Sequence, residues 1–358
     1  MRFELNDDQR ELREFVRAFL ERHAGPEAVR AAALDGDGFA REAWERLTGE
    51  MELTALAIDP ERGGAGASFV EVGIALEELG RTLLPVPYLP TVVAAAALAG
   101  APEAGELLER IAGGAAAAVA LDGDGIEARA GAGGLLVSGT ASYVIDAPHA
   151  ELFVCAARLD GEPTPVALRR GEGVEVEPLM TLDATRRQGE LRLDGAPALR
   201  LAAPGEGEAA LGRARDLLSV GLAVEAVGAA ARIFEVTLDY LRERVQFGRP
   251  IGTFQALKHR CADLAAGLEA ARSTAYYAAW AADGAPEELP VLGPLARAVC
   301  NDAFLKVAAE AIQMHGGIGF TWEHDAHLYF KRAKSTELLG GGSRAWRRLA
   351  AERAGILG

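Results

Sequence analysis

Lysine is scarce in this chain of 358 residues and occurs only at positions 258, 306, 331 and 334. Alanine, glycine and arginine are abundant, a preference that we attribute to genome composition rather than to function. The formal net charge is −15 and the isoelectric point is near 5. A strongly acidic chain is repelled by the negative charge of nucleic acid and of anionic membranes, so we expect neither as a partner.

Cysteine is almost as rare, with Cys155, Cys261 and Cys300 spread widely along the chain. This spacing fits neither a disulfide framework nor a zinc site, which favours the reducing cytosol. Glu4 and Asp7 lie where a signal peptide would carry positive charge, and no apolar run is long enough to cross a bilayer. We therefore expect a cytoplasmic protein without a membrane-spanning segment.

The pattern of apolar residues changes twice along the chain. Residues 1–118 and 206–358 show helical periodicity, whereas residues 119–205 contain short β-rich runs separated by Gly, Asp and Pro. The sequence predicts an α+β, mainly α architecture in three domains with these boundaries. Expected helices include one that starts at Asn6-Asp7-Asp8 and others near 69–83, 211–244, 254–282, 289–316 and 343–354, and expected strand segments are 135–137, 143–145 and 152–155.

Two short segments in the last third carry the clearest functional signal. The first, residues 244–255, places the guanidinium of Arg244, the ring of Phe247 and the carboxamide of Gln255 around the end of a long helix. A fixed cationic fork with nearby amide donors is suited to a dinucleotide diphosphate.

The second segment follows about sixty residues later and includes Gln313, Gly316 and Gly317. A Gly-Gly pair after a carboxamide lets bare main chain approach a ligand closely. Both segments are similar to the FAD-binding signatures of the acyl-CoA dehydrogenase family, and the weaker landmarks at 61–66 and 77–81 resemble that family as well.

The resemblance implies an acyl-CoA dehydrogenase fold. In that fold an N-terminal helical domain (1–118) and a central antiparallel β domain (119–205) precede a C-terminal four-helix bundle (206–358) that holds the FAD diphosphate. It also implies FAD as cofactor, an acyl-CoA thioester as substrate and an electron-transfer flavoprotein-type acceptor. The ADP end of FAD is then held by Arg244, Phe247, Gln255, Gln313, Gly316 and Gly317 against a neighbouring subunit, which is either a second copy or a homologous chain in a dimer or tetramer.

The chain departs from the family where the catalytic base belongs. The family's Glu-Gly-Thr, with Glu as base, is replaced by Gly340-Gly341-Gly342, and the Gln that follows it corresponds to Arg344. Some relatives carry the base near the start of the long helix, a position that corresponds to Leu218, with Ser219 in place of an adjacent Arg. Neither position carries a carboxylate here.

The residues that face the flavin ring in the family are altered too. The Thr-Glu-Pro-x-x-Gly-Ser-Asp segment is reduced to Val119-Ala120-Leu121-Asp122-Gly123, and the Thr of a Trp-Ile-Thr strand becomes Ile145. The half of the site that faces a neighbour is intact, whereas the half that faces the flavin is degraded.

Glu225 is the one weak candidate for a relocated base. It lies seven residues after Leu218 on the same helix face, about 10 Å along the axis, so a shift of helix or substrate would be needed. It is alternatively a buried partner of an arginine. The segment 322–327 has two His and two acids, which is a weak metal signal, and we expect no metal; His315 is expected to be an ordinary loop histidine.

These observations predict the degenerate subunit of a hetero-oligomeric acyl-CoA dehydrogenase, in which a complete partner supplies the base and the flavin pocket. Such paired subunits resemble those of steroid side-chain breakdown, which would make the substrate a ring-bearing acyl-CoA. Two alternatives remain open. One is a self-sufficient homo-oligomer with a relocated base, and the other is a structural paralogue without flavin or chemistry.

Overall fold

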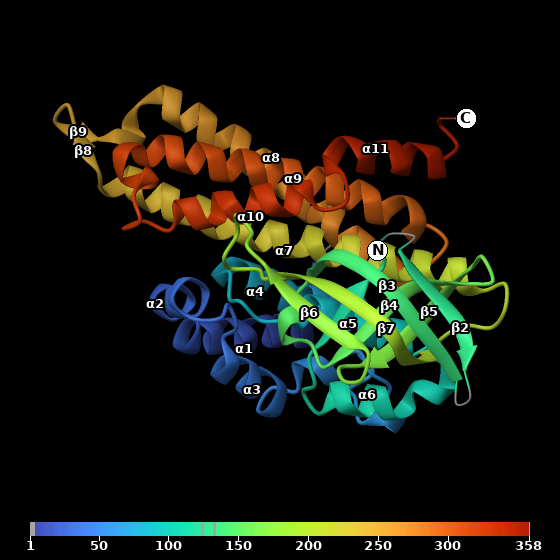
Figure 1. Cartoon of the computed structure of the whole chain (residues 1–358). Coiled ribbons are helices and arrows are strands. Elements are labelled where there is room, and N and C mark those ends of the chain that lie inside the picture. The colour runs from blue at the N-terminus through green and yellow to red at the C-terminus, as the bar shows by residue number, and fades with distance from the viewer. Residues whose placement is uncertain (1–3, 123–124, 132–133, 358) are drawn as a thin grey trace. The chain divides into compact units, whose positions relative to one another are not determined.

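The computed structural model describes residues 4–122, 125–131 and 134–357, and it divides into two compact units that interleave along the chain (Figure 1). Each unit is described separately below. Unit 1 comprises Met1–Val29, Gly73–Leu84 and Ser219–Gly358, and unit 2 comprises Arg30–Val72 and Pro85–Leu218.

Helices account for most of the described residues. They are α1 (Asp7–His23), α2 (Pro26–Arg30), α3 (Arg41–Gly49), α4 (Phe69–Thr82), α5 (Tyr88–Leu98), α6 (Gly105–Ala112), α7 (Gly207–Glu243), α8 (Gln255–Gly284), α9 (Leu289–His315), α10 (Ala326–Leu338) and α11 (Gly342–Arg353). The strands are β1 (Ala117–Ala120), β2 (Ile126–Gly131), β3 (Gly134–Ile145), β4 (Leu152–Leu159), β5 (Glu162–Arg169), β6 (Val174–Leu179), β7 (Gln188–Arg200), β8 (Val245–Gln246) and β9 (Arg249–Pro250).

In unit 1, α1 begins as the sequence predicts. The Asn6 side chain accepts a hydrogen bond from the backbone N–H of Gln9, and the Gln9 side chain accepts one from the Asn6 N–H. This reciprocal capping box satisfies two of the donors that a helix start leaves free. Further along α1, Arg17 donates through Nε and Nη2 to the buried carboxylate of Glu78 on α4, at 2.9 and 2.7 Å.

Helices α4 and α7 cross at backbone contact in unit 1. A Cβ added at Gly80 would lie 2.2 Å from the carbonyl oxygen of Glu225, and one added at Gly228 would lie 1.9 Å from that of Glu77. Real Cβ atoms do not approach oxygen so closely, so only glycine permits this crossing at either position.

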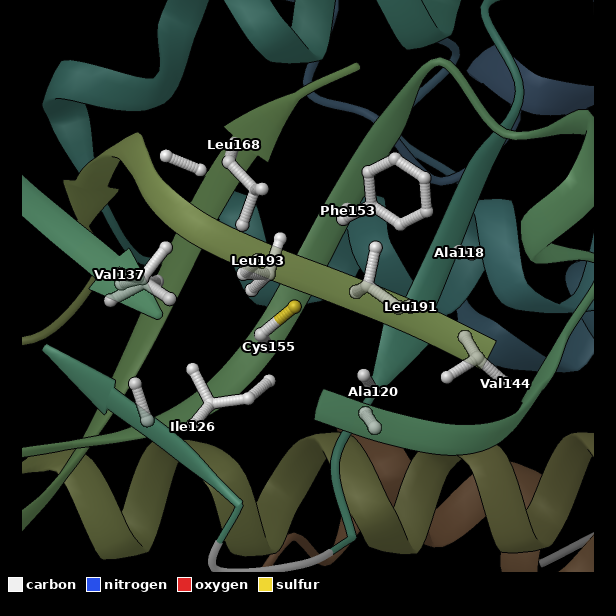
Figure 2. Packing of buried hydrophobic residues seen from close by; sticks show 14 of the residues in the cluster. Ala118, Ala120, Ile126, Val137, Val144, Phe153, Cys155, Leu168, Leu191 and Leu193 are labelled. Atoms are coloured by element: carbon white, nitrogen blue, oxygen red, sulfur yellow. The ribbon is translucent and has the colours of Figure 1, made fainter. Parts of the chain in front are cut away.

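In unit 2 the strands are hydrogen-bonded in the order β1-β4-β2-β3-β7-β5. Strand β6 pairs with β7, and β4 also pairs with β5. Most pairs are antiparallel, while β1 and β2 run parallel to β4. Figure 2 shows side chains including Phe153, Cys155, Leu191 and Leu193 gathered in the core of this sheet. Burial raises the pKa of the Cys155 thiol to about 12, so this cysteine is a packing residue.

Two of the expected strand segments, 135–137 and 143–145, belong to the single long strand β3. The sequence predicts separate runs divided by turns that contain Gly, Asp or Pro. The structure instead has register irregularities between Val137 and Gly139 and between Ala141 and Val144, and Gly139 adopts φ +140°. Glycine therefore allows a bulge within the strand rather than a turn that ends it.

By length and composition, α7 is the one helix among the described residues that could cross a membrane. Of its apolar 18-residue window, 83% is buried within the structure, which is typical of a core helix.

Candidate functional site

Arg244 and Phe247 lie where α7 gives way to the short hairpin of β8 and β9, which projects from the end of the helices (Figure 1). The backbone N–H of Ile251 donates to the carbonyl of Arg244 at 2.8 Å, which closes the hairpin onto the helix end. Phe247 has φ +55° and the following Gly248 has φ +77°. This tight turn leaves the Phe247 ring 90% exposed.

Gln255 is the first residue of α8, directly after the hairpin. The ring of Phe254 lies edge-on to Phe247 at 6.1 Å, and the guanidinium of Arg249 lies 4.2 Å from the Phe254 ring centroid. These contacts order the turn without using the Gln255 side chain, which is exposed. The N-terminus of a long helix also presents free N–H groups and a partial positive charge, which suit an anion.

The second motif closes α9 at the same end of unit 1. The hydroxyl of Tyr240 donates to the carbonyl of His315 at 3.3 Å, and the two rings stack at 4.5 Å. This contact brings the last turn of α7 against the last turn of α9, so two motifs about sixty residues apart in sequence become neighbours. Gln313 is exposed on α9, and a Cβ added at Gly316 or Gly317 would meet nothing within 4 Å.

The six predicted cofactor residues therefore share one end of unit 1 and are all exposed. Within the described ranges, the side chains of Arg244, Gln255 and Gln313 have no ion-pair or hydrogen-bond partner. A free guanidinium, two free carboxamides and open space beside two glycines match the needs of a diphosphate and its sugars. The donor set fits the ADP half of FAD.

Residue 340, where the resemblance places the family's base, lies in the loop between α10 and α11. Gly340, Gly341 and Gly342 have φ of +67°, +104° and +79°, a left-handed run that only glycine adopts easily. The indole of Trp346 lies against this loop, because a Cβ at Gly340 would be 2.5 Å from its Cζ2. The alternative position that the resemblance suggests, Leu218, is partly buried, and Ser219 beside it is fully buried.

Glu225 lies on α7 with its carboxylate turned to α10. Its Oε1 is 2.6 Å from Nη1 of Arg332, and the two side chains are 13% and 4% exposed. The sequence left two roles open for Glu225, a relocated base and a buried partner of an arginine. This geometry favours the second role, because the carboxylate is already engaged by a cation.

The residues of unit 2 that correspond to the flavin-facing positions differ in exposure. Ile145 is buried, whereas Tyr143 is 65% exposed with φ +58°. Val119 and Leu121 are buried, and Gly123 lies outside the described residues. Ile145 therefore offers neither a hydroxyl nor access to a ligand.

His315 directly precedes the Gly-Gly pair and is buried. Its Nδ1 is 2.7 Å from the carbonyl oxygen of Ala311, and its ring centroid lies 4.2 Å from that of His324. Burial lowers the pKa of His315, so the neutral ring is favoured. In the segment 322–327, His324 instead accepts a hydrogen bond from the Ala326 N–H, and His327 contacts Trp322 edge-on.

Two family models match the chain, one before and one after the strands of the sheet in the sequence. The acyl-CoA dehydrogenase N-terminal domain matches residues 6–106, and the acyl-CoA dehydrogenase C-terminal domain matches residues 210–355. The chain is 38% identical over 349 residues to acyl-CoA dehydrogenase IpdE2 of Mycobacterium tuberculosis, covering 97% of both chains. It is 36% identical over 349 residues to IpdE2 of Mycolicibacterium smegmatis, covering 97% of this chain and 99% of the relative. The chain therefore belongs to the acyl-CoA dehydrogenase family of FAD-dependent oxidoreductases.

Solved structures agree with this assignment. A chain of the Tcur3481-Tcur3483 steroid ACAD G363A variant is 30% identical, with a TM-score of 0.90 and 98% of each chain covered. A chain of the ChsE4-ChsE5 complex from Mycobacterium tuberculosis is 29% identical, with a TM-score of 0.91 and complete coverage of both chains. Butyryl-CoA dehydrogenase from Megasphaera elsdenii shares the fold at a TM-score of 0.91 and 22% identity.

Sequence reasoning missed Trp346 and Arg332. Neither residue belongs to a motif. Arg332 contacts Glu225 and Trp346 contacts Gly340 only because the helices pack together. The only sequence signal for Trp346 was a large aromatic residue shortly after three glycines.

Proposed function

We propose that this chain is the base-lacking subunit of a hetero-oligomeric acyl-CoA dehydrogenase and that it clamps the ADP half of an FAD whose flavin lies in a homologous partner. One contrast carries the proposal. The clamp residues at the end of unit 1 are exposed and free to bind, whereas glycine occupies position 340 and leucine occupies position 218. The similarity to chains from ChsE4-ChsE5 and from Tcur3481-Tcur3483 supports a paired assembly.

Each clamp residue would bind the part of the cofactor that suits its side chain. Arg244 would bind the diphosphate, since a guanidinium forms charge-assisted, bidentate bonds with such oxygens. Gln255 and Gln313 would bind sugar or phosphate oxygens, Phe247 would form an apolar wall, and Gly316 and Gly317 would admit the ligand to the main chain. When bound, the flavin supplies the acceptor for the β hydrogen of an acyl thioester, while a carboxylate takes the α proton.

We further propose that the substrate is a bulky, ring-bearing acyl-CoA and that electrons leave to an electron-transfer flavoprotein-type acceptor in the cytoplasm. The 30% identity to a chain of a steroid ACAD supports the ring-bearing substrate by analogy. The base in this scheme belongs to the partner subunit.

The two alternatives have less support. A self-sufficient homo-oligomer would need Glu225 as base, but Glu225 is engaged by Arg332. A structural paralogue without cofactor would have no use for an exposed arginine and two carboxamides beside an open Gly-Gly turn.

The test is the flavin content of the chain purified alone and after co-expression with a homologous dehydrogenase subunit. We expect one FAD per pair of unlike chains, and we expect Arg244→Ala to weaken FAD binding roughly tenfold or more, because each charge-assisted bond contributes about 1.5–3 kcal/mol. Arg242→Ala is the matched control, since Arg242 is an exposed cation nearby that pairs with Asp239. A full flavin per chain in the isolated protein, or unchanged flavin content in Arg244→Ala, would refute the proposal.

A further inference from the structure

The loop after α10 has a second feature besides the lack of a carboxylate at position 340. The carbonyl oxygen of Leu339, directly before Gly340, accepts a hydrogen bond from Nη2 of Arg297 at 2.7 Å and one from Nε1 of Trp346 at 3.4 Å. Arg297 lies on α9 and Trp346 on α11, so the loop is fixed from both neighbouring helices.

Arg297 and Trp346 also hold each other. The guanidinium carbon of Arg297 lies 4.0 Å from the indole ring centroid, a cation–π contact, and Arg297 is only 4% exposed. One residue beyond Trp346, Arg347 forms an ion pair with Asp302 of α9. The indole is therefore anchored through its N–H, its face and its helix.

This anchoring decides what position 340 can accept. A Cβ there would lie 2.5 Å from Cζ2 and 3.3 Å from Cη2 of Trp346, and the first distance is shorter than real Cβ contacts. A side chain at 340 would have to displace a ring that is held by two other interactions. The neighbouring Gly341 is different, because its Cβ would meet only the Cβ of Ala345 at 3.2 Å.

We propose that Trp346, positioned by Arg297, is a plug that excludes any side chain from the family's base position in this chain. The proposal rests on the proposed function only for the identity of position 340 as that base position. A base at position 340 therefore cannot be restored by a single substitution. Two residues, Gly340 and Trp346, would have to change together before this subunit could carry a base of its own.

The test is a double-mutant cycle read by thermal denaturation of the chain in the assembly in which it is purified. Gly340→Ala is made in the wild-type and in a Trp346→Phe background, because phenylalanine removes the ring edge that contains Cζ2. We expect Gly340→Ala to lower Tm by about 3–6 °C in the wild type and by no more than half of that with Trp346→Phe. The left-handed strain of an alanine at position 340 is common to both backgrounds and cancels in the cycle.

Gly341→Ala is the matched control. Its φ is also positive, but its Cβ does not face the indole, so its effect on Tm should be equal in both backgrounds. Trp346→Ala is a second background that removes the whole ring, so the loss of Tm caused by Gly340→Ala should be smallest there. An equal loss for Gly340→Ala with and without Trp346 would overturn the plug. The readout is independent of flavin content, so it separates failure of the plug from failure of the paired-subunit function.

Discussion

Glu225 on α7 and Arg332 on α10 form a close, largely buried ion pair, with Oε1 and Nη1 2.6 Å apart. The pair connects two helices through residues that are 107 positions apart along the chain. A carboxylate held in this way stabilises the fold. A catalytic base must instead be free to approach the α carbon of the substrate.

Glu225→Gln should therefore destabilise the protein. Removing one partner of a buried pair leaves the other charge poorly compensated, which typically costs about 3–5 kcal/mol. Urea denaturation measures the effect, with Glu243→Gln as a control at an exposed site on the same helix. A variant with unchanged stability but abolished turnover would support the relocated-base alternative instead.

The isolated chain should be catalytically silent. Loss of a positioned general base typically lowers the rate about 10²–10⁴-fold, and positions 340 and 218 both lack one. Reduction of an artificial electron acceptor, followed with a panel of ring-bearing and linear acyl-CoA substrates, measures this. Robust turnover by the chain alone would contradict the prediction.

Gly340→Glu by itself should restore no dehydrogenation and should lower Tm. The substitution forces a glutamate into the left-handed region and against the Trp346 indole. The measurements are acceptor reduction and thermal denaturation, compared with the double variant Gly340→Glu/Trp346→Ala. A well-folded and active single variant would show that the loop is more adaptable than its contacts indicate.

Much of unit 1 could be predicted from the sequence. The start of a helix at Asn6-Asp7-Asp8 depends on local chemistry that the neighbouring residues carry, whereas the cofactor roles of Arg244 and Gln313 stay predictions. The structure confirms the start of α1 at the Asn6 cap. Helix α10 was not anticipated, because the polar segment that precedes it hides its start.

Sequence reasoning offered an arginine partner for Glu225 as one alternative but could not identify Arg332, and it did not anticipate the contact of Trp346 with Gly340. The Glu225–Arg332 pair and the contact of Trp346 with Gly340 depend on the angle and register at which helices pack. Periodicity gives the buried face of a helix but not its neighbour. Likewise, the joining of two predicted strand segments into β3 depends on a bulge at Gly139 that the sequence alone does not show.

Glu78→Gln should loosen α1 from α4. The buried carboxylate of Glu78 accepts two hydrogen bonds from Arg17 and also lies within ion-pair distance of Arg13 and Arg81. We expect a loss of about 1–3 kcal/mol in the free energy of unfolding, because the Glu78 carboxylate is buried while its partner Arg17 is 43% exposed.

The control for this loss is the exposed Glu42–Arg46 pair of α3. Glu42→Gln should change the unfolding free energy by less than about 1 kcal/mol, because exposed pairs contribute little. Hydrogen exchange of α1 amides identifies the affected element. Equal effects for Glu78→Gln and Glu42→Gln would contradict the interpretation.

The stability of the protein should fall in mild acid partly because of His315. Burial lowers its folded pKa below the ordinary value of 6.5, so the unfolded state binds the proton more readily. The contribution of His315 is complete above pH 6.5 and is lost as the pH falls through the folded pKa. His315→Asn should flatten the decline of Tm between about pH 7 and pH 5, whereas His259→Asn, at an exposed site, should not. Parallel pH profiles for wild type and His315→Asn would exclude this role.

The glycine crossing of α4 and α7 restricts how this chain could evolve a base on α7. Moving the carboxylate of Glu225 toward position 218 requires α7 to slide along its axis by about two turns. A slide of even one turn in that direction would carry Arg232 to the place of Gly228, opposite the Glu77 carbonyl, where a Cβ has no room. The crossing therefore acts as an axial lock on α7, so a new acid would have to arise by substitution on a stationary helix and not by translation of the existing one.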